Sequence, residues 1–263
     1  MKIVCFGDNW GAPMLCRNLP SESIAGIVGA EIRPQYHHEL KTLAESLLVD
    51  FLIQPTKMSP GYPGFLESIR GLALDFIFVN SYSMLLHTDL LAIPTRGAIN
   101  IHGGLLPGYR GCNPTQWALL NDEKETGVTI HYMDADFDSG DIIAQQKVPI
   151  LEEDTWIDIQ KRIDSASEEL FANTIYEILS GTNSRVRQEE SMAHYWRRRT
   201  PEDGQFSWTW RAREIYNLVR ALVKPHPGAF YYNEGGEKVV LNSFIPLDEI
   251  KELQAARVGH AIE

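Results

Sequence analysis

Asn-Ile-His-Gly-Gly-Leu-Leu-Pro-Gly-Tyr-Arg-Gly, residues 100–111, is the stretch that decides the fold of this chain. The apolar residues that lead into it from Gly97 predict a short buried strand, which ends at two glycines. Side chains alternate along a strand, so Asn100 and His102 share one face. In open α/β sheets, ligands bind outside the carboxyl ends of parallel strands. We therefore predict that this polar pair carries the chemistry of the protein.

An acidic glycine turn joins the two strands that come next in the sequence. It contains four aspartates, namely Asp134, Asp136, Asp138 and Asp141. Any of them could bring a carboxylate to Asn100 and His102, and the others would be turn formers that bond their own backbone. His131 lies on the strand before the turn. From the sequence it is either a support for the polar pair or an ordinary core histidine.

The order of elements predicts an α/β fold with a mostly parallel, Rossmann-like sheet. Continuous apolar runs alternate with amphipathic segments, which is typical of a parallel sheet covered on both faces. The expected strands are residues 2–6, 24–28, 49–53, 75–80, 97–102, 126–133 and 142–149. The expected helices of this part are residues 12–18, 36–48 and 155–179.

A polar stretch at residues 181–185 is expected to be a linker between two domains. We expect a catalytic domain over residues 1–182 and a small α+β accessory domain over residues 183–263. The second domain should hold a helix near 211–223 and a β-pair, 228–233 with 238–244.

The composition argues against several classes of protein. The 263-residue chain has 24 basic and 35 acidic residues, a net charge of −11, whereas a nucleic-acid-binding protein usually shows a basic face. The basic run Arg197–Arg199 is suited to the phosphates of a small anionic ligand. No apolar run is long enough to span a membrane. We therefore expect no nucleic-acid partner and no membrane association.

Short motifs narrow the cofactors and the compartment. Gly7 and Gly11 do not form the Gly-x-Gly-x-x-Gly pattern of dinucleotide sites, and no Cys/His spacing suits a metal. We expect no nicotinamide and no metal. The three cysteines, Cys5, Cys16 and Cys112, form no pairing pattern. Reduced thiols and the absence of a signal peptide at the amino terminus favour the cytoplasm.

These motifs resemble those of the formyltransferases that use 10-formyltetrahydrofolate. That family includes glycinamide ribonucleotide transformylase, methionyl-tRNA formyltransferase and the sugar-nucleotide N-formyltransferases, and the chain is most similar to the last group. The resemblance covers about residues 1–180 and continues weakly through 201–204 and 225–230. It rests on Asn100–His102, Leu105–Pro107, Tyr109–Gly111, Pro114, Thr126–Ile130 and Asp138–Asp141. Many relatives carry Ser where this chain has Gly104, so a hydrogen bond from that position is lost.

The resemblance implies that Asn100, His102 and Asp138 are the catalytic residues, with Asp141 as the alternative carboxylate. Formyl transfer to an amine passes through a tetrahedral intermediate with a negative oxygen, and an amide or a protonated imidazole can donate to it. Asp138 can orient His102 and stabilise its protonated form. His102 is either the proton acceptor or an oxyanion donor, and we expect it to accept the proton of a sugar amine.

The resemblance also implies ligand-binding residues, with 10-formyltetrahydrofolate as the co-substrate. For the pterin it implies Ser83, Met84, Leu85 and Leu86 on one side and Asp134, Asp136 and Phe137 on the other. For the acceptor substrate we expect Trp10, Tyr109 and Arg110. Further aromatic walls are expected from Trp196, Trp208, Trp210 and Tyr231.

Three acceptors compete within the family. A methionyl-tRNA enzyme is expected to carry a long basic loop after the second strand, whereas residues 30–36 are short and contain only Arg33 as a basic residue. A glycinamide ribonucleotide enzyme is expected to have a glycine- and serine-rich loop where Asp8-Asn9-Trp10 stands. We therefore expect an amino sugar linked to dTDP or UDP, formylated for a surface polysaccharide.

Two other readings stay open: a hydrolase of formyltetrahydrofolate and a protein that only binds folate. The intact trio argues against pure binding. A further expectation concerns assembly, because an exposed C-terminal β-pair favours a homodimer.

Overall fold

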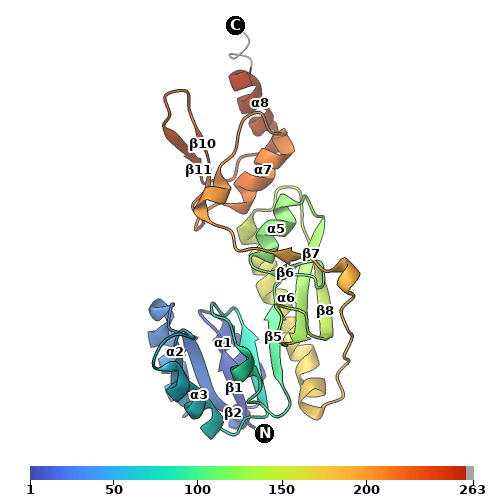
Figure 1. The fold of residues 1–263 in the computed structure, drawn as a ribbon. Coiled ribbons are helices and arrows are strands. Elements are labelled where there is room, and N and C mark those ends of the chain that lie inside the picture. The colour runs from blue at the N-terminus through green and yellow to red at the C-terminus, as the bar shows by residue number, and fades with distance from the viewer. Residues whose placement is uncertain (259–263) are drawn as a thin grey trace.

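The computed structural model of the chain describes residues 1–258 and contains a seven-stranded sheet with a smaller α+β unit at one end (Figure 1). The strands lie in the order β3-β2-β1-β4-β5-β7-β8. The first five are parallel, whereas β7 and β8 are antiparallel. Their bounds are β1 Ile3–Phe6, β2 Ile24–Ala30, β3 Asp50–Gln54, β4 Phe76–Asn80, β5 Ala98–His102, β7 Glu125–Tyr132 and β8 Ile142–Pro149. This confirms the predicted fold class.

Alternation along the strands divides the apolar side chains between two cores. On β1, Ile3 and Cys5 pack on one face and Val4 and Phe6 on the other. The first face is covered by α1 (Gly11–Asn18), α2 (His37–Ser46) and α6 (Trp156–Ser180), and the second by α3 (Tyr62–Gly71) and α4 (Thr88–Leu91). The central strands β1, β2 and β4 are therefore buried on both sides, as their continuous apolar runs predicted, whereas the edge strands β3 and β8 are partly exposed.

The long helix α6 closes the first part of the chain. A capping box of Thr155 and Asp158 begins it, and Gly181 ends it in the left-handed region at φ 78°. Ile159, Ile163 and other residues of its apolar stripe pack into the core.

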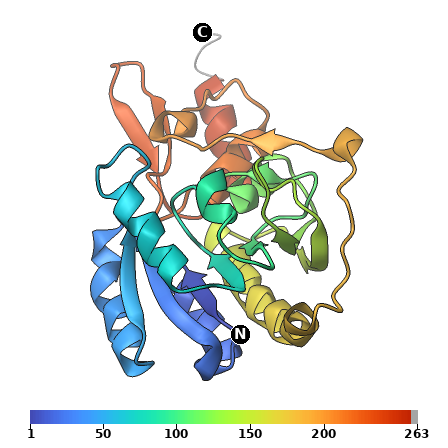
Figure 2. The ribbon, with the colours of Figure 1, turned by 60° about the horizontal axis from the view of Figure 1, so that its bottom comes forward.

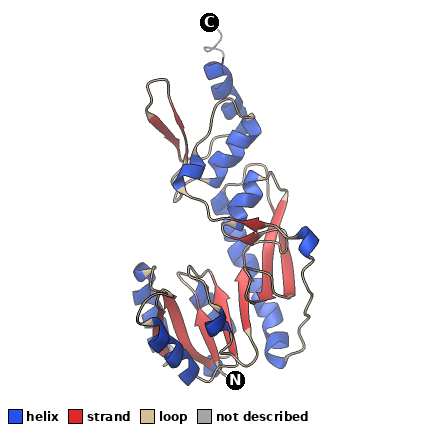
Figure 3. Ribbon diagram, in the orientation of Figure 1, coloured by secondary structure: helices blue, strands red, loops and turns tan. Residues whose placement is uncertain are grey.

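The second part is built from α7 (Ala212–Ala221), the hairpin of β10 (Ala229–Tyr232) and β11 (Lys238–Leu241), and α8 (Leu247–Val258). It has its own apolar core around Phe206, Ile215 and Tyr231, and Figure 3 shows its helices beside the hairpin at the C-terminal end. Trp208 and Tyr231, expected as aromatic walls, pack against each other in this core and do not line the large cavity described below.

The segment between the two parts returns to the first one. Val186 bridges to Ile142 of β8, and β9 (Tyr195–Trp196) pairs with β6 (Arg110–Gly111). Figure 2 shows this segment running along the outside of the sheet domain. We propose that the domain boundary lies near residue 182 in the chain, although the residues just after it pack on the first domain.

Several helices escaped the sequence analysis. They are α3, α4, α5 (Pro114–Leu120) and α8, together with 3-10 turns at Ser21–Ser23, Pro34–Tyr36, Glu190–Met192 and Pro201–Gly204. Pro63 and Gly64 lie in the first turn of α3, and Pro114 begins α5. Proline and glycine favour turns in a sequence pattern, so the sequence did not predict α3 and α5.

Candidate active site

Asn100 and His102 lie on one face at the carboxyl end of β5. His102 is buried, with 7% of its surface exposed, whereas Asn100 is half-buried. The register places Asn100 beside Val79 of β4 and opposite His131 of β7. The pair therefore sits at the point where the parallel and antiparallel parts of the sheet meet.

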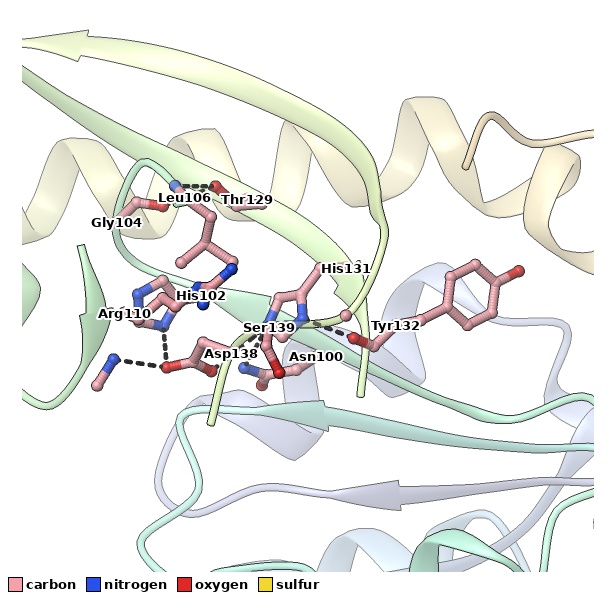
Figure 4. Close-up of polar contacts among 12 residues, drawn as sticks. Asn100, His102, Gly104, Leu106, Arg110, Thr129, His131, Tyr132, Asp138 and Ser139 are labelled. Atoms are coloured by element: carbon pink, nitrogen blue, oxygen red, sulfur yellow. Dashed lines mark hydrogen bonds and ion pairs between the residues drawn. The ribbon is translucent and has the colours of Figure 1, made fainter. Parts of the chain in front are cut away.

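The turn between β7 and β8 brings Asp138 to this pair (Figure 4). Its Oδ2 lies 3.7 Å from His102 Nδ1 and accepts a 2.8 Å hydrogen bond from the Gly111 amide, and its Oδ1 lies 3.5 Å from His131 Nε2. Burial alone would raise the pKa of Asp138. The charges of the two imidazoles in their protonated forms, with the hydrogen bonds from His131 and Gly111, outweigh that effect and hold the pKa well below its usual range. Asp138 is thus an ionised carboxylate between two imidazoles.

His131 supports Asn100 and is not simply part of the core. Its Nδ1 lies 2.8 Å from the Tyr132 carbonyl oxygen, which can only accept, so Nδ1 carries a proton. In the neutral ring, Nε2 is then an acceptor for Asn100 Nδ2 at 3.2 Å. This contact points the amide nitrogen toward His131 and leaves its second N–H for another acceptor.

The surroundings of the His102 ring suit a residue that accepts a proton. Its Nε2 lies 2.7 Å from the Tyr109 carbonyl oxygen and must donate to it, so the lone pair of the neutral ring is on Nδ1. That nitrogen faces Asp138. A proton that arrives there is stabilised by the carboxylate, and the imidazolium finds an acceptor for each N–H.

A cavity of about 560 Å³ opens in front of Asn100 and His102. Three arginines and two tryptophans from distant segments also line it. These residues are Arg33, Arg198, Arg199, Trp10 and Trp156. His226 joins them and packs edge-on against Trp156, with 4.4 Å between the ring centres. The cavity thus combines the polar pair, called here the reacting end, with cationic and aromatic side chains, called here the cationic end.

Sequence reasoning found only part of this wall. Trp10 lines the cavity as expected of an acceptor-binding residue. Arg198, Arg199 and His226 lie in motifs that the sequence showed, the basic run and the Pro-His-Pro segment, but no local pattern tied them to the pocket. Trp156 was counted only as a core residue of a helix.

Tyr109 and Arg110 were expected to bind the acceptor, but neither lines the cavity. Tyr109 stacks on Trp196 and donates to Glu123. The Arg110 side chain is fully buried, and its guanidinium bonds Gln188, Glu190 and Tyr195. Four of its five N–H donors are thus used on protein partners, and burial keeps the side chain from a ligand in the cavity.

The residues expected at the pterin are spread over different environments. Ser83 lines the cavity, and its amide donates to Asp8. Leu86 is packed in the core on the α3 face, with 3% exposed, so it cannot cover a ligand. Met84 and Leu85 are more accessible, and Asp134, Asp136 and Phe137 are exposed on the acidic turn. Asp134 and Asp136 border a separate hollow of about 280 Å³ with Arg185 and Arg187.

Gly104 has a steric role in this chain. A Cβ built there would lie 2.7 Å from Pro114 Cβ and 3.0 Å from His102 Nε2. The missing side chain therefore lets the loop close against the His102 ring.

No group of His, Cys, Asp and Glu side chains in residues 1–258 could hold a metal ion. No helix within this range is long and apolar enough to cross a membrane.

Comparison with known proteins gives the family. The formyl transferase family matches residues 37–175, and the formyl transferase C-terminal domain matches residues 198–263. The chain therefore belongs to the formyl transferase family, and it is an N-formyltransferase.

Solved structures share its fold. A 4-N formyltransferase from Francisella tularensis is 22% identical, with a TM-score of 0.77 over 93% of this chain and 97% of that one. An N-formyltransferase from Helicobacter canadensis, in complex with folinic acid and dTDP-3-aminofucose, is 20% identical, with a TM-score of 0.66 over 85% and 81%. The formyltransferase PseJ from Anoxybacillus kamchatkensis, in complex with UDP-4,6-dideoxy-4-formamido-L-AltNAc and tetrahydrofolate, is 25% identical, with a TM-score of 0.53 over 77% and 89%.

Proposed function

We propose that the protein transfers the formyl group of 10-formyltetrahydrofolate to the amine of a nucleotide-linked amino sugar. The observation that carries this proposal is one cavity lined both by Asn100 and His102, which Asp138 supports from behind, and by arginines and tryptophans. The relatives from Helicobacter and Anoxybacillus were solved with folates and nucleotide-linked sugars, which supports both substrates.

The cationic end suits a diphosphate. Arg198 is exposed, and the Arg199 Nε has no hydrogen-bond partner among the described residues. Burial lowers the pKa of Arg199, although the charge of Asp203 partly offsets this. A diphosphate that bridged both guanidiniums would stabilise their charge through bidentate hydrogen bonds. Trp156 and Trp10 would then offer flat apolar surface to the base and the sugar.

The reacting end suits attack by an amine on a formyl group. The sugar amine would form a bond to the formyl carbon, and the free N–H of Asn100 would stabilise the negative oxygen. The amine proton would pass to His102 Nδ1, where the Asp138 carboxylate holds the imidazolium. The bond from carbon to the folate nitrogen then breaks, and that nitrogen takes up the proton that His102 received, which returns the imidazole to its neutral form.

The folate is proposed to lie near Ser83, Met84 and Leu85 and the exposed acidic turn of Asp134, Asp136 and Phe137. Its formyl group would enter the cavity beside Asn100. We retain these residues as proposed pterin contacts and omit Leu86, which is packed in the core.

A tRNA acceptor fits the chain less well. The net charge is −11, and the cavity holds only three arginines, whereas a nucleic-acid backbone needs a broader basic surface. Hydrolysis of formyltetrahydrofolate needs only water at the same site. A test of formate release without an amine acceptor distinguishes that activity from transfer.

The direct experiment is incubation with 10-formyltetrahydrofolate and a panel of TDP-, UDP- and GDP-linked amino sugars. Mass spectrometry should detect the gain of one formyl group on a dTDP- or UDP-linked sugar. Formate release with no formylated product from any amino sugar of the panel would contradict the proposal.

The setting of the reaction is also proposed. We place the enzyme in the cytoplasm, with an N-formylated sugar destined for a surface polysaccharide such as the O-antigen of lipopolysaccharide. We propose a homodimer, and light scattering of the purified protein tests it.

A further inference from the structure

A side chain from the segment after α6 holds the turn that carries Asp138. Gln188 is buried, with 5% exposed, and its Nε2 donates to the Asp138 carbonyl at 2.7 Å and to the Gly140 carbonyl at 2.8 Å. Both N–H bonds of the amide are therefore used on two carbonyls of one turn.

Arg110 determines which way this amide points. Its Nε donates to Gln188 Oε1 at 2.9 Å, and because a guanidinium has no acceptor, the amide oxygen must face it. The other nitrogens of Arg110 bond Glu190 at 3.0 and 2.7 Å and Tyr195 at 2.8 Å. The arginine is thus fixed by its own partners, and the NH₂ group of Gln188 can face only the turn.

The turn depends on such support. Asp138 has φ 51°, in the left-handed region that costs free energy for a residue other than glycine. A Cβ at Gly140 would lie 2.0 Å from the Tyr132 carbonyl oxygen, so the backbone is packed closely on both sides. The neighbour of Arg110, Gly111, donates its amide to the Asp138 carboxylate.

We propose that Arg110 and Gln188 are positioning residues, which hold Asp138 in place beside His102 and His131 so that docking of the 183–200 segment completes the active site. This inference rests on the proposed function, in which Asp138 stabilises the proton on His102. It gives Arg110 a role in the reaction without contact to the substrate.

The test compares Gln188→Met and Gln188→Glu with a control, Gln146→Met. Methionine keeps the length of the side chain but removes the donors, and glutamate turns an oxygen toward two carbonyls. Gln146 lies on β8, and its amide bonds Glu169 instead of the turn. Two quantities are measured: hydrogen exchange of the Gly111 amide by NMR, and kcat and KM for formyl transfer.

Both Gln188 variants should speed Gly111 exchange at least about tenfold, and should lower kcat up to about a hundredfold because a displacement near 1 Å is enough for that loss. KM should stay within about threefold, since the cavity wall is untouched. The control should change neither quantity. A purely structural role would instead lower the melting temperature and leave kcat of the folded enzyme unchanged, which would overturn the proposal.

Other outcomes separate this inference from the proposed function. Unchanged hydrogen exchange of the Gly111 amide in a folded Gln188 variant would overturn the positioning role of Gln188. Faster Gly111 exchange in the Gln188 variants, together with a wild-type enzyme that formylates no amino sugar, would support the positioning role of Gln188 and contradict the proposed function. If both Gln188 variants fail to fold, Glu190→Gln is the milder change, and it should speed Gly111 exchange by a smaller factor. No change in that variant would then contradict the role of Arg110.

Discussion

Two groups of residues at the cavity, the polar cluster and the cationic and aromatic lining, are built in different ways. The reacting end is compact: Asn100, His102 and His131 come from two adjacent strands, and one turn adds Asp138 within 3.7 Å. The cationic end draws Arg33, Trp156 and Arg199 from segments far apart in the sequence. The comparison suggests that the chemistry is specified by local geometry and the choice of acceptor by the assembly of the chain. Changes at the first end should therefore alter kcat, and changes at the second KM.

The largest effect is expected at the proton acceptor. His102→Ala and Asp138→Asn should each lower kcat at least about a hundredfold, because general acid–base catalysis contributes about 10² to 10⁴. Steady-state kinetics at saturating substrates measure this, and circular dichroism checks the fold. A near-normal kcat in either folded variant would remove the residue from the mechanism.

Asn100→Ala should lower kcat by about 10² to 10³, the usual loss on removing one oxyanion donor. The affinity for a folate analogue, measured by calorimetry, should change little, because the amide acts on a charge that develops only in the transition state. A loss of folate affinity with an unchanged kcat would reassign Asn100 to binding.

At the cationic end, Arg198→Ala should raise KM for the nucleotide sugar by about tenfold or more, given about 1.5–3 kcal/mol for a hydrogen bond to a charged group. The kcat at saturation should stay within about threefold. Arg70→Ala, on the surface of α3 where the arginine pairs with Glu67, is the control outside this cavity. Equal effects of the two substitutions on KM would show that the cavity does not bind the diphosphate.

The smallest effect concerns stability and pH. The pKa of Asp138 is depressed in the folded protein, so its contribution to stability is present above the unfolded value of about 3.9 and is lost as the pH falls through the folded value. Asp138→Asn should therefore lower the free energy of unfolding at neutral pH, and the difference from the wild type should shrink below about pH 4. Urea unfolding at several pH values measures it. A difference that grows in acid would contradict the ionised carboxylate.

The sequence predicted the sheet and the reacting end because each depends on near neighbours. Strand alternation alone put Asn100 and His102 on one face, and continuous apolar runs marked the parallel strands. The position of Asp138 came from resemblance, since four aspartates in one turn look alike without the contacts to Gly111 and Gln188.

The rest depends on tertiary contacts that no local pattern encodes. Arg110 was expected to bind the acceptor, but Gln188, Glu190 and Tyr195 take four of its five donors in a fully buried site. Leu86 was expected to cover the pterin, but in the segment after β4 its side chain packs into the core. Trp156 looked like one more apolar residue of α6, although it begins the helix at the cavity.

The most direct test of the account is a competition between acceptors. Wild-type enzyme with 10-formyltetrahydrofolate is given methionyl-tRNA and dTDP- and UDP-linked amino sugars at equal concentration, and the formylated products are measured by mass spectrometry. The account predicts a formylated nucleotide sugar and no formylmethionyl-tRNA above background. Efficient formylation of the tRNA with no sugar product would contradict it.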